Sequence, residues 1–337
     1  MTALRALADV LAEHGLDGVE ATPLRHDGWS GAQMTRLVRQ DGARFVLKRD
    51  SLARDWIARV TEDVPELREA LFVRAFPPLP APVALPHLGV ARDGNDVVLL
   101  MPDLTGTLIP WEVPVDGATA DRVLLALAAL HAKPWHDALG SAFPWTDLET
   151  RITLLTRRSA ARYEAAGLPV GERFRQGWDA FDRRASVPAR ELMDRLTNDP
   201  APLITALGRL PAVGLHGDLK LGNAGLAPDG TVFMIDWQMT LVAPVAVELG
   251  WFLVCNVAGL PFEPDETFER YRVAAGVLHD ERWATQRDLA IVVGLLLRGW
   301  RKGYDAEAGL ELPNGWTAAD DLAWWCEAAV VAAARRL

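Results

Sequence analysis

The stretch LHGDLKLGN, residues 215–223, places a histidine, an aspartate, a lysine and an asparagine in one short segment bordered by apolar chain. A plain turn needs only one or two Gly, Asn or Asp residues, so this set requires another explanation. The next stretch, NAGLAPDGTVFMIDW, has two apolar runs around APDG. Because Pro, Asp and Gly favour a tight turn at 228–230, we predict a β-hairpin at 224–238.

The hairpin register predicts which side chains meet at the open end. If the residues flanking the turn pair, Asn223 lies opposite residue 235, next to Asp236, and Asp218 lies in the loop leading in. Two carboxylates and an amide oxygen are hard ligands that suit Mg²⁺, whose remaining ligands are water and phosphate oxygens. Taken singly, each residue is better explained as a turn former or strand end. The spaced set favours the catalytic-loop and metal-aspartate arrangement of phosphoryl transfer.

Composition limits the classes of protein to consider. With 337 residues, half of them apolar, the chain suits one large domain or two lobes. Its net charge of −10 disfavours a general nucleic-acid binder, so we expect no nucleic-acid partner. The two cysteines, Cys255 and Cys326, lie in apolar surroundings and are expected to be reduced, buried thiols. The oligomeric state is left open.

Two segments bear on location. Residues 1–15 predict an amphipathic helix and not a signal peptide, because Asp9 and Glu13 lie among spaced leucines. Residues 241–260 are long and apolar enough to suggest a membrane span. Glu248 in the middle of that run favours a buried helix of a water-soluble core instead. We therefore expect no membrane partner and a cytoplasmic protein.

The order of patterns predicts an α+β protein with a small antiparallel β-rich N-terminal lobe and a larger helical C-terminal lobe. One helix is expected within the first lobe at 61–76, capped by Thr61 or Asp63. The β pattern at 224–238 is the only one expected after the hinge. Expected strands and helices are VEATPL, MTRLVRQ, RFVLKR and VVLLM, then 118–132, two or three arginine-rich helices in 150–198, and a mostly helical 262–337.

The motif HGDLKLGN followed by MIDW resembles the aminoglycoside phosphotransferase family, small-molecule kinases with the protein-kinase-like fold. The resemblance extends over most of the chain. It implies a nucleotide-binding lobe at 1–104 with a hinge at about 101–105. It also implies a helical lobe at 105–337, with a catalytic loop, a metal-binding hairpin, and acceptor-binding helices at 141–200 and 262–337.

The resemblance also implies how the nucleotide is held. RFVLKR resembles the strand whose lysine, Lys48, contacts the α- and β-phosphates, and LREALFVRAF resembles the helix whose glutamate, Glu69, pairs with that lysine. VVLLMPDL resembles the last small-lobe strand and the hinge that holds the adenine, with Met101 and Asp103. DGWSGAQ matches the loop over the phosphates only loosely, through Ser30. The implied cofactors are ATP, with GTP also open, and Mg²⁺.

The resemblance implies the chemistry of the loop as well. Asp218 would accept the proton of an acceptor hydroxyl, Asn223 and Asp236 would hold magnesium, and Lys220 would neutralise charge near the γ-phosphate. His216 is expected to be a buried hydrogen-bonding residue, because the aspartate already supplies the base. The family usually has Asp-Leu where this chain has Glu248-Leu249, which leaves the role of that position open.

Glu248 follows Asp236 by only twelve positions, which leaves too little chain for a peptide platform, so the predicted acceptor is a small molecule. It would be an antibiotic such as an aminoglycoside, or a sugar or amino-alcohol metabolite. A non-catalytic nucleotide-binding module and a structural protein remain as alternatives. Acidic residues that could attract a cationic acceptor, but are better explained as surface charge, are Asp305, Glu307, Glu311, Asp320 and Asp321.

Overall fold

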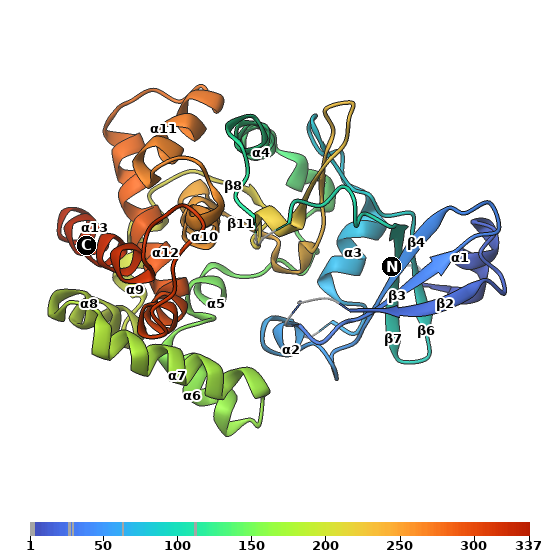
Figure 1. Cartoon of the computed structure of the whole chain (residues 1–337), viewed down its shortest axis with the longest axis horizontal. Coiled ribbons are helices and arrows are strands. Elements are labelled where there is room, and N and C mark those ends of the chain that lie inside the picture. Colours follow the sequence, from blue (N-terminus) through green and yellow to red (C-terminus); the bar gives the residue numbers. More distant parts are fainter. Residues whose placement is uncertain (1–3, 26–27, 29, 63, 111–112) are drawn as a thin grey trace.

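The computed structural model describes residues 4–25, 28, 30–62, 64–110 and 113–337. Figure 1 shows a β-rich part that carries the N-terminus and a larger helical part that carries the C-terminus. The predicted α+β class, with a small antiparallel-rich sheet region and a larger helical region, is confirmed.

One six-stranded sheet forms the β-rich part. All neighbouring strands are antiparallel except β1 and β6, which run parallel. The four strands expected from sequence are present, and β1 and β6 were not anticipated. In spatial order the strands are β1 (Arg5–Ala6), β6 (Gly89–Asp93), β7 (Asp96–Pro102), β4 (Arg44–Asp50), β3 (Gln33–Val38) and β2 (Glu20–Leu24).

The sheet buries both faces, as the alternation along its central strands requires. Leu47 of β4 and Leu100 of β7 pack on one side, against helix α1 (Leu7–Glu13). Val46 and Met101 point to the other side and pack against helix α3 (Arg68–Ala75). The side chain of Lys48 shares this second side, so β4 directs it towards α3.

The prediction of a single helix at 61–76 is wrong. The chain instead forms α2 (Trp56–Thr61), then a turn, then α3. Pro65 explains the break, because the residue before a proline avoids the helical conformation. Thr61 ends α2 instead of capping a helix, and Asp55 caps α2 by accepting hydrogen bonds from two backbone amides. Asp63, the other expected cap, lies outside the described residues.

The helical part is built around the long helix α12 (Glu281–Glu307), which packs against α7, α10 and α13. Residues 148–198 contain four helices, where two or three were expected. The remaining helices are α4 (Gly117–Ala132), α5 (Leu148–Thr153), α6 (Arg157–Ala165), α7 (Pro169–Arg184), α8 (Val187–Asn198), α9 (Ala201–Leu207), α10 (Val245–Asn256), α11 (Pro264–Ala274) and α13 (Ala318–Arg336).

Helices α10 and α12 approach closely because a glycine faces the contact. A Cβ at Gly250 would lie 2.2 Å from the carbonyl oxygen of Ala290, so no larger residue fits without moving a helix. This contact fixes the position of α10, which lies against the loop that follows strand β8 (Ala212–Leu215). Residues 241–260 form a short strand followed by the twelve-residue α10. Among the described residues, no helix has the length and apolarity that a membrane crossing requires.

Two small sheets complete the fold. The predicted hairpin is present as β9 (Ala224–Leu226) and β10 (Val232–Met234), in the predicted register. Strand β5 (Val83–Ala84) adds to it in parallel. Strands β8 (Ala212–Leu215) and β11 (Leu241–Pro244) pair in antiparallel orientation and were not predicted from the sequence. In the sequence, β8 precedes the hairpin and β11 follows it. Together they hold both ends of the segment that begins with LHGD.

Candidate active site

The loop after β8 follows a path that only glycine permits at its second position. Gly217 has a φ of 84°, and a Cβ there would lie 1.9 Å from the carbonyl oxygen of Met239. The loop therefore rests directly on the backbone that follows Asp236. This contact keeps the two functional segments, 215–223 and 236–239, together independently of any ligand.

Glu248 anchors the same loop from below. Its carboxylate accepts hydrogen bonds from the backbone amides of His216, at 3.0 Å, and Gly217, at 2.7 Å. His131 of α4 contacts it at 3.0 Å, and Tyr271 contacts the other ring nitrogen. Burial acts to raise the pKa of Glu248, but the His131 contact and these amides hold the pKa below its ordinary value. Glu248 therefore acts as a buried anionic cap for the loop.

Two further side chains fix the loop to the helical part. Arg151 of α5 donates from Nε to the carbonyl oxygen of Gly217 at 2.9 Å. Asn256, at the end of α10, accepts a hydrogen bond from the amide of Leu221 at 2.9 Å. Neither residue was singled out in the sequence, because each lies far along the chain from the loop it supports.

The loop brings three of the predicted site residues together. Lys220 Nζ lies 3.3 Å from Asp218 Oδ2, and Asn223 donates from Nδ2 to the backbone oxygen of Asp218 at 2.8 Å. Burial acts to lower the pKa of Lys220, but the charges of Asp218 and Asp236 outweigh it and raise the pKa. The ammonium is therefore fixed as a cation beside two carboxylates.

His216 is buried and hydrogen bonded, as predicted from the sequence. Its Nε2 lies 2.9 Å from the carbonyl oxygen of Ile235, and its ring packs on Trp237. Burial lowers the pKa of His216, so the neutral ring can donate from Nε2 to that carbonyl. The contact joins the loop to the strand end that precedes Asp236.

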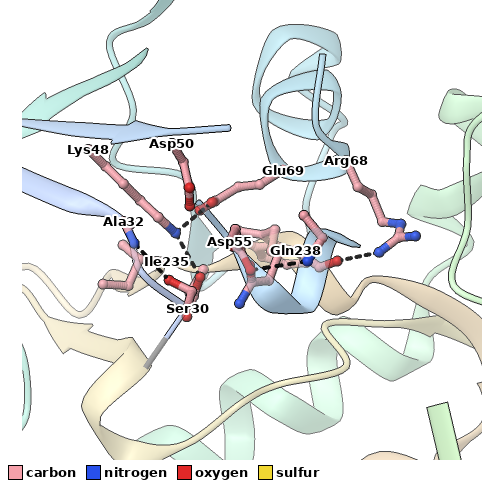
Figure 2. A network of polar contacts seen from close by, with 12 residues as sticks. Ser30, Ala32, Lys48, Asp50, Asp55, Arg68, Glu69, Ile235 and Gln238 are labelled. Carbon is pink, nitrogen blue, oxygen red and sulfur yellow. Dashed lines mark hydrogen bonds and ion pairs between the residues drawn. The ribbon is translucent and has the colours of Figure 1, made fainter. Parts of the chain in front are cut away.

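The open end of the hairpin carries Asp236 towards the sheet. The amide of Ile235 donates to the oxygen of Asn223 at 3.1 Å, which keeps the predicted pairing up to Asp236. Asp236 then turns with a left-handed φ of 69°. Lys48 Nζ lies 2.8 Å from Asp236 Oδ1 and 2.6 Å from Glu69 Oε2, as Figure 2 shows for the Lys48 side chain. One ammonium thus bridges carboxylates from two distant segments.

These three groups are strongly coupled. Burial would lower the pKa of Lys48, but the charges of Asp236 and Glu69 raise the pKa well above its ordinary value. Burial raises the pKa of Glu69 to about 7 despite the ammonium beside it. Burial also acts to raise the pKa of Asp236, yet Lys48 and Lys220 hold that pKa below its ordinary value. The site therefore contains two ammonium groups, those of Lys48 and Lys220. It also contains three carboxylates, those of Glu69, Asp236 and Asp218.

Helix α3 is locked onto the residues that follow Asp236. Arg68 and Glu69 leave the helix in different directions, Glu69 towards Lys48 and Arg68 towards the carbonyl oxygen of Gln238, which it contacts at 2.6 Å (Figure 2). One turn on, Phe72 stacks on Trp237 at 4.3 Å between ring centres. Arg68 is almost fully buried. Besides Glu62 and Thr61 on the preceding segment, its partners are backbone oxygens, including those of Pro144 and Gln238, and no residue pattern marks such distant contacts.

A second group of buried ionisable residues lies near Lys48. The carboxyl groups of Asp50, at the end of β4, and Asp55, the cap of α2, hydrogen bond to each other. Burial, and then the charge of Asp50, raise the pKa of Asp55 to about 8. His87 lies nearby with both ring nitrogens buried and unpartnered among the described residues, and burial lowers its pKa to about 3. The pair Asp50–Asp55 thus shares one proton at neutral pH.

The other residues predicted to bind nucleotide lie at the edges of this site. Ser30 accepts a hydrogen bond from the amide of Ala32 at 3.4 Å, while Asp27 and Trp29 of its loop lie outside the described residues. Met101 places its side chain in the core beneath the sheet. Asp103, just beyond the end of β7, accepts a hydrogen bond from Arg36 Nε at 2.7 Å. The geometry leaves the roles of these residues as predictions.

The acidic residues of α12 and α13 are engaged within the protein. Asp305 pairs with Arg301 at 2.7 Å, and Asp321 pairs with Lys302 at 2.5 Å in a buried contact. The others are Glu307, which pairs with Arg183, Asp320, which completes a capping box with Thr317, and the exposed Glu311. Four of the five therefore make local structural contacts, and the expectation of surface charge is wrong for Asp321, which is buried against Lys302.

Known proteins with the same fold bind nucleotides and small molecules. A spectinomycin phosphotransferase in complex with ADP and spectinomycin is 13% identical, with 96% of this chain and 98% of that chain covered and a TM-score of 0.55. An amicoumacin kinase in complex with AMP-PNP and Ca²⁺ is 11% identical, with 96% and 92% covered and a TM-score of 0.55. A choline/ethanolamine kinase family protein from Mesorhizobium loti is 16% identical, with 96% of each chain covered and a TM-score of 0.53.

At these identities the solved structures support the fold alone. No curated protein sequence matches the chain significantly. The family model described as the phosphotransferase enzyme family matches residues 20–285, which is most of the chain and includes the strands, the loop and the hairpin described above. The resemblance found in the sequence is therefore confirmed, and the chain belongs to the phosphotransferase enzyme family.

Proposed function

We propose that the protein transfers the γ-phosphate of a nucleoside triphosphate to a hydroxyl group of a small molecule, with Mg²⁺. The observation that carries the proposal is the bridge from Lys48 to Glu69 and Asp236, 2.6 and 2.8 Å long. Such a bridge joins a sheet strand, a helix and the hairpin at one point. Phosphoryl transfer depends mainly on this kind of positioning and on charge neutralisation.

Asp218 is the proposed base. It lies in a loop that Glu248 and Arg151 hold at the backbone, so its carboxylate is positioned by buried contacts and not by the substrate. A positioned base contributes roughly 10²–10⁴-fold to rate. Lys220, 3.3 Å from that carboxylate, would place a positive charge beside the transferred group.

The residues of the site fit a magnesium ion. Asn223 donates from its amide nitrogen to the backbone oxygen of Asp218, which leaves its amide oxygen as a candidate ligand, and backbone pairing places Asp236 close to Asn223. Mg²⁺ commonly takes one or two protein oxygens and keeps water and phosphate oxygens for the rest. In the described residues no three His, Cys, Asp or Glu cluster as a complete protein cage. Bound there, the ion would neutralise phosphate charge.

Lys48 is the proposed contact to the α- and β-phosphates, with Glu69 fixing the direction of its ammonium. Residues 1–104 would form the nucleotide-binding lobe, with Ser30 over the phosphates and the hinge at Met101 and Asp103 beside the base. The helical lobe, 105–337, would supply the loop, the metal ligands and the acceptor site. ATP is the proposed donor, consistent with the ADP and AMP-PNP named for two similar structures.

A small acceptor is proposed because the segment after Asp236 is short and buried. It contains one 3₁₀ turn, Trp237–Met239, and strand β11, and then enters α10. That segment offers no loop on which a peptide would lie. An antibiotic or a metabolite with a hydroxyl group fits the proposal, and the names of similar structures include both kinds.

The test is nucleotide consumption in the presence of candidate acceptors, with Asp218→Asn as the blank. Wild-type protein should consume ATP in an acceptor- and Mg²⁺-dependent way, and the variant should lose roughly 10²–10⁴-fold of that rate. Mg²⁺–AMP-PNP should raise the Tm of both proteins equally. A raised Tm with no turnover by either protein would support the non-catalytic alternative, and the absence of any shift would refute nucleotide binding.

A further inference from the structure

Three cations surround the loop 215–223 on the side of the helical part. Arg151 extends from α5, Lys220 belongs to the loop itself, and Arg298 extends from α12. Figure 1 shows α5, α10 and α12 as neighbours in the helical part. Lys48 and Glu69, in contrast, approach the site from the sheet. The loop therefore has a separate cationic side of its own.

Trp251 of α10 contacts two of these cations through its ring. The guanidinium carbon of Arg151 is 4.7 Å from the ring centre of Trp251, and that of Arg298 is 5.6 Å from it. Arg151 also donates to the carbonyl oxygen of Gly217, the residue that precedes Asp218, so this arginine contacts the loop next to the proposed base. Arginine stacks readily on indole, and this arrangement holds both guanidinium planes in place.

Neither guanidinium has a carboxylate partner among the residues that the structure describes. Lys220 is paired with Asp218 and Arg301 with Asp305, whereas Arg151 and Arg298 form no ion pair within 4 Å. Arg151 is nearly fully buried, and its Nη1 atom has no hydrogen-bond partner in the described chain. A buried charge without a direct counter-ion is costly, and Asp218 and Glu248 act on Arg151 only from beyond ion-pair distance, so a further anion would be stabilised here.

The electrostatic influence of Arg298 reaches the loop. Burial raises the pKa of Cys255, one turn beyond Trp251, and the positive charges of Arg298 and Lys220 oppose that rise. Arg298 also opposes the rise in the pKa of Lys220. Burial lowers the pKa of Arg151, which Asp218 counteracts only in part. Arg298, Lys220 and Arg151 therefore act on one common space next to the proposed base.

We propose that the acceptor carries a carboxylate or phosphate group, which Arg298 binds, supported by Arg151 across the Trp251 ring, while the acceptor hydroxyl faces Asp218. This inference rests on the proposed function, because it needs Asp218 to act on a hydroxyl. It names the acceptor class as anionic hydroxy compounds. A polycationic acceptor would meet like charge at this position. Of the five acidic residues considered for attracting it, four are already paired or used as caps, and the fifth, Glu311, is exposed.

Matched acceptors test the proposal. The carboxylate arm compares D-glycerate with glycerol and pantothenate with panthenol, and the phosphate arm compares glycerol 3-phosphate with glycerol. Choline and spectinomycin supply the cationic arm. We expect kcat/KM for the anionic member of a pair to exceed that of its neutral match at least tenfold. A better neutral or cationic acceptor, with its turnover lost in Asp218→Asn, would overturn the inference and leave the proposed function intact.

Variants of Arg298 identify the group responsible. Arg298→Gln should raise KM for the anionic acceptor about tenfold or more, with KM for ATP unchanged, and should leave the neutral match unaffected. Arg298→Lys should retain part of the preference, because it keeps the charge and loses the planar fork. Arg282→Gln is the control, since Arg282 is exposed near the start of the same helix. An equal loss on both members of a pair would indicate a structural role and contradict the proposal.

A second measurement needs no acceptor. With Mg²⁺–AMP-PNP saturating, phosphate and acetate are each compared with chloride at equal ionic strength, and the Tm of wild type and Arg298→Gln is recorded. We expect an extra rise in Tm of about 2 °C or more for wild type alone. Identical shifts in the two proteins would overturn the anion site. The shift caused by Mg²⁺–AMP-PNP itself reports on the proposed function, so the two failures are distinguishable.

Discussion

The two sides of the loop 215–223 have opposite charge balances. Towards the sheet, the single ammonium of Lys48 is shared by Glu69 and Asp236, and Asp50 lies close behind. Towards the helices, two guanidinium groups share one tryptophan and no carboxylate within ion-pair distance among the described residues. The first side is short of positive charge and the second is short of negative charge.

Each charge imbalance indicates which kind of ion would bind on that side of the loop. A carboxylate-rich space is completed by a divalent cation, which then brings phosphate oxygens with it. A guanidinium-rich space is completed by an oxyanion, because the planar fork of arginine matches carboxylate and phosphate geometry. The comparison therefore links the proposed donor side and the proposed acceptor side through one argument about uncompensated buried charge.

The largest expected effect comes from removing the shared cation. Lys48→Met leaves Glu69 and Asp236 as close carboxylates with no ammonium between them. Loss of one partner from a buried ion pair costs about 3–5 kcal/mol, so the free energy of unfolding should fall by that order, and phosphotransfer should fall at least 100-fold. Chemical denaturation and nucleotide consumption measure the two effects.

Lys133→Met is the matched control for Lys48→Met, because Lys133 is exposed at the end of α4 and should tolerate the change. If Lys48→Met were as stable as the control, the carboxylates on the sheet side would not depend on this ammonium, and the contrast between the two sides would be lost.

The next effect concerns the anion that supports both sides. Glu248→Gln keeps the shape of the side chain but removes its charge and one acceptor oxygen, while two backbone amides and His131 still point at it. A hydrogen bond to a charged group contributes about 1.5–3 kcal/mol, so we expect a loss of about 2–4 kcal/mol in the free energy of unfolding. Turnover should fall because the Asp218 loop loosens.

Glu327→Gln, at an exposed position of α13, controls for charge removal alone. Amide hydrogen exchange gives a direct reading for Glu248→Gln, since the amides of His216 and Gly217 should lose protection. Unchanged protection of those two amides would mean that Glu248 does not hold the loop.

The proton shared by Asp50 and Asp55 predicts a pH effect. The folded-state pKa of Asp55, about 8, lies above its unfolded value of about 4, so wild-type stability should fall as pH rises between these values and stay low above pH 8. Asp55→Asn mimics the protonated acid and can still accept from the amides of Ile57 and Ala58. Its advantage should grow to about 1–3 kcal/mol at pH 8.

Urea denaturation between pH 5 and pH 8.5 measures this difference. Asp147→Asn is the control, because Asp147 caps α5 in the same way but lies at the surface. A constant difference between Asp55→Asn and wild type over the whole range would show that no proton is held by the pair.

The sequence predicted the loop and the hairpin because both are local. Gly217, Asp218 and Asn223 lie within one loop, and the turn at 228–230 determines the hairpin register without help from the rest of the fold. The family resemblance added Lys48 and Glu69, which no local rule connects. Their meeting with Asp236 needs the sheet, α3 and the hairpin to be in place.

The remaining features depend on contacts that leave no pattern in the sequence. Arg68 contacts backbone oxygens distant in the sequence, as well as Glu62 and Thr61 nearby, and Asn256 accepts from a backbone amide, so no residue pattern marks their distant contacts. The single helix expected at 61–76 failed because Pro65 breaks it, a signal that was present but outweighed by the apolar spacing. The two arginines beside Trp251 come from α5 and α12, and Trp251 comes from α10, so the group is recognisable only in space.

The smallest expected effect is a difference in stability between two variants of Arg298, on the helical side of the loop. Arg298→Glu would supply an internal anion across the Trp251 ring from Arg151, whereas Arg298→Gln removes the charge only. If that space has an excess of positive charge, the Glu variant should be more stable than the Gln variant by about 0.5–1 kcal/mol at low ionic strength. The difference should shrink in 0.5 M NaCl, because salt screens partly exposed charges.

The opposite order of stability for these two variants would mean that Asp218 dominates the potential next to Trp251, with Lys220 unable to balance it. The arginines would then serve to offset the base itself and no anionic acceptor group would be needed there. The expected order, together with loss of the phosphate-dependent rise in Tm in the Glu variant, would tie the excess charge to anion binding at one place in the fold.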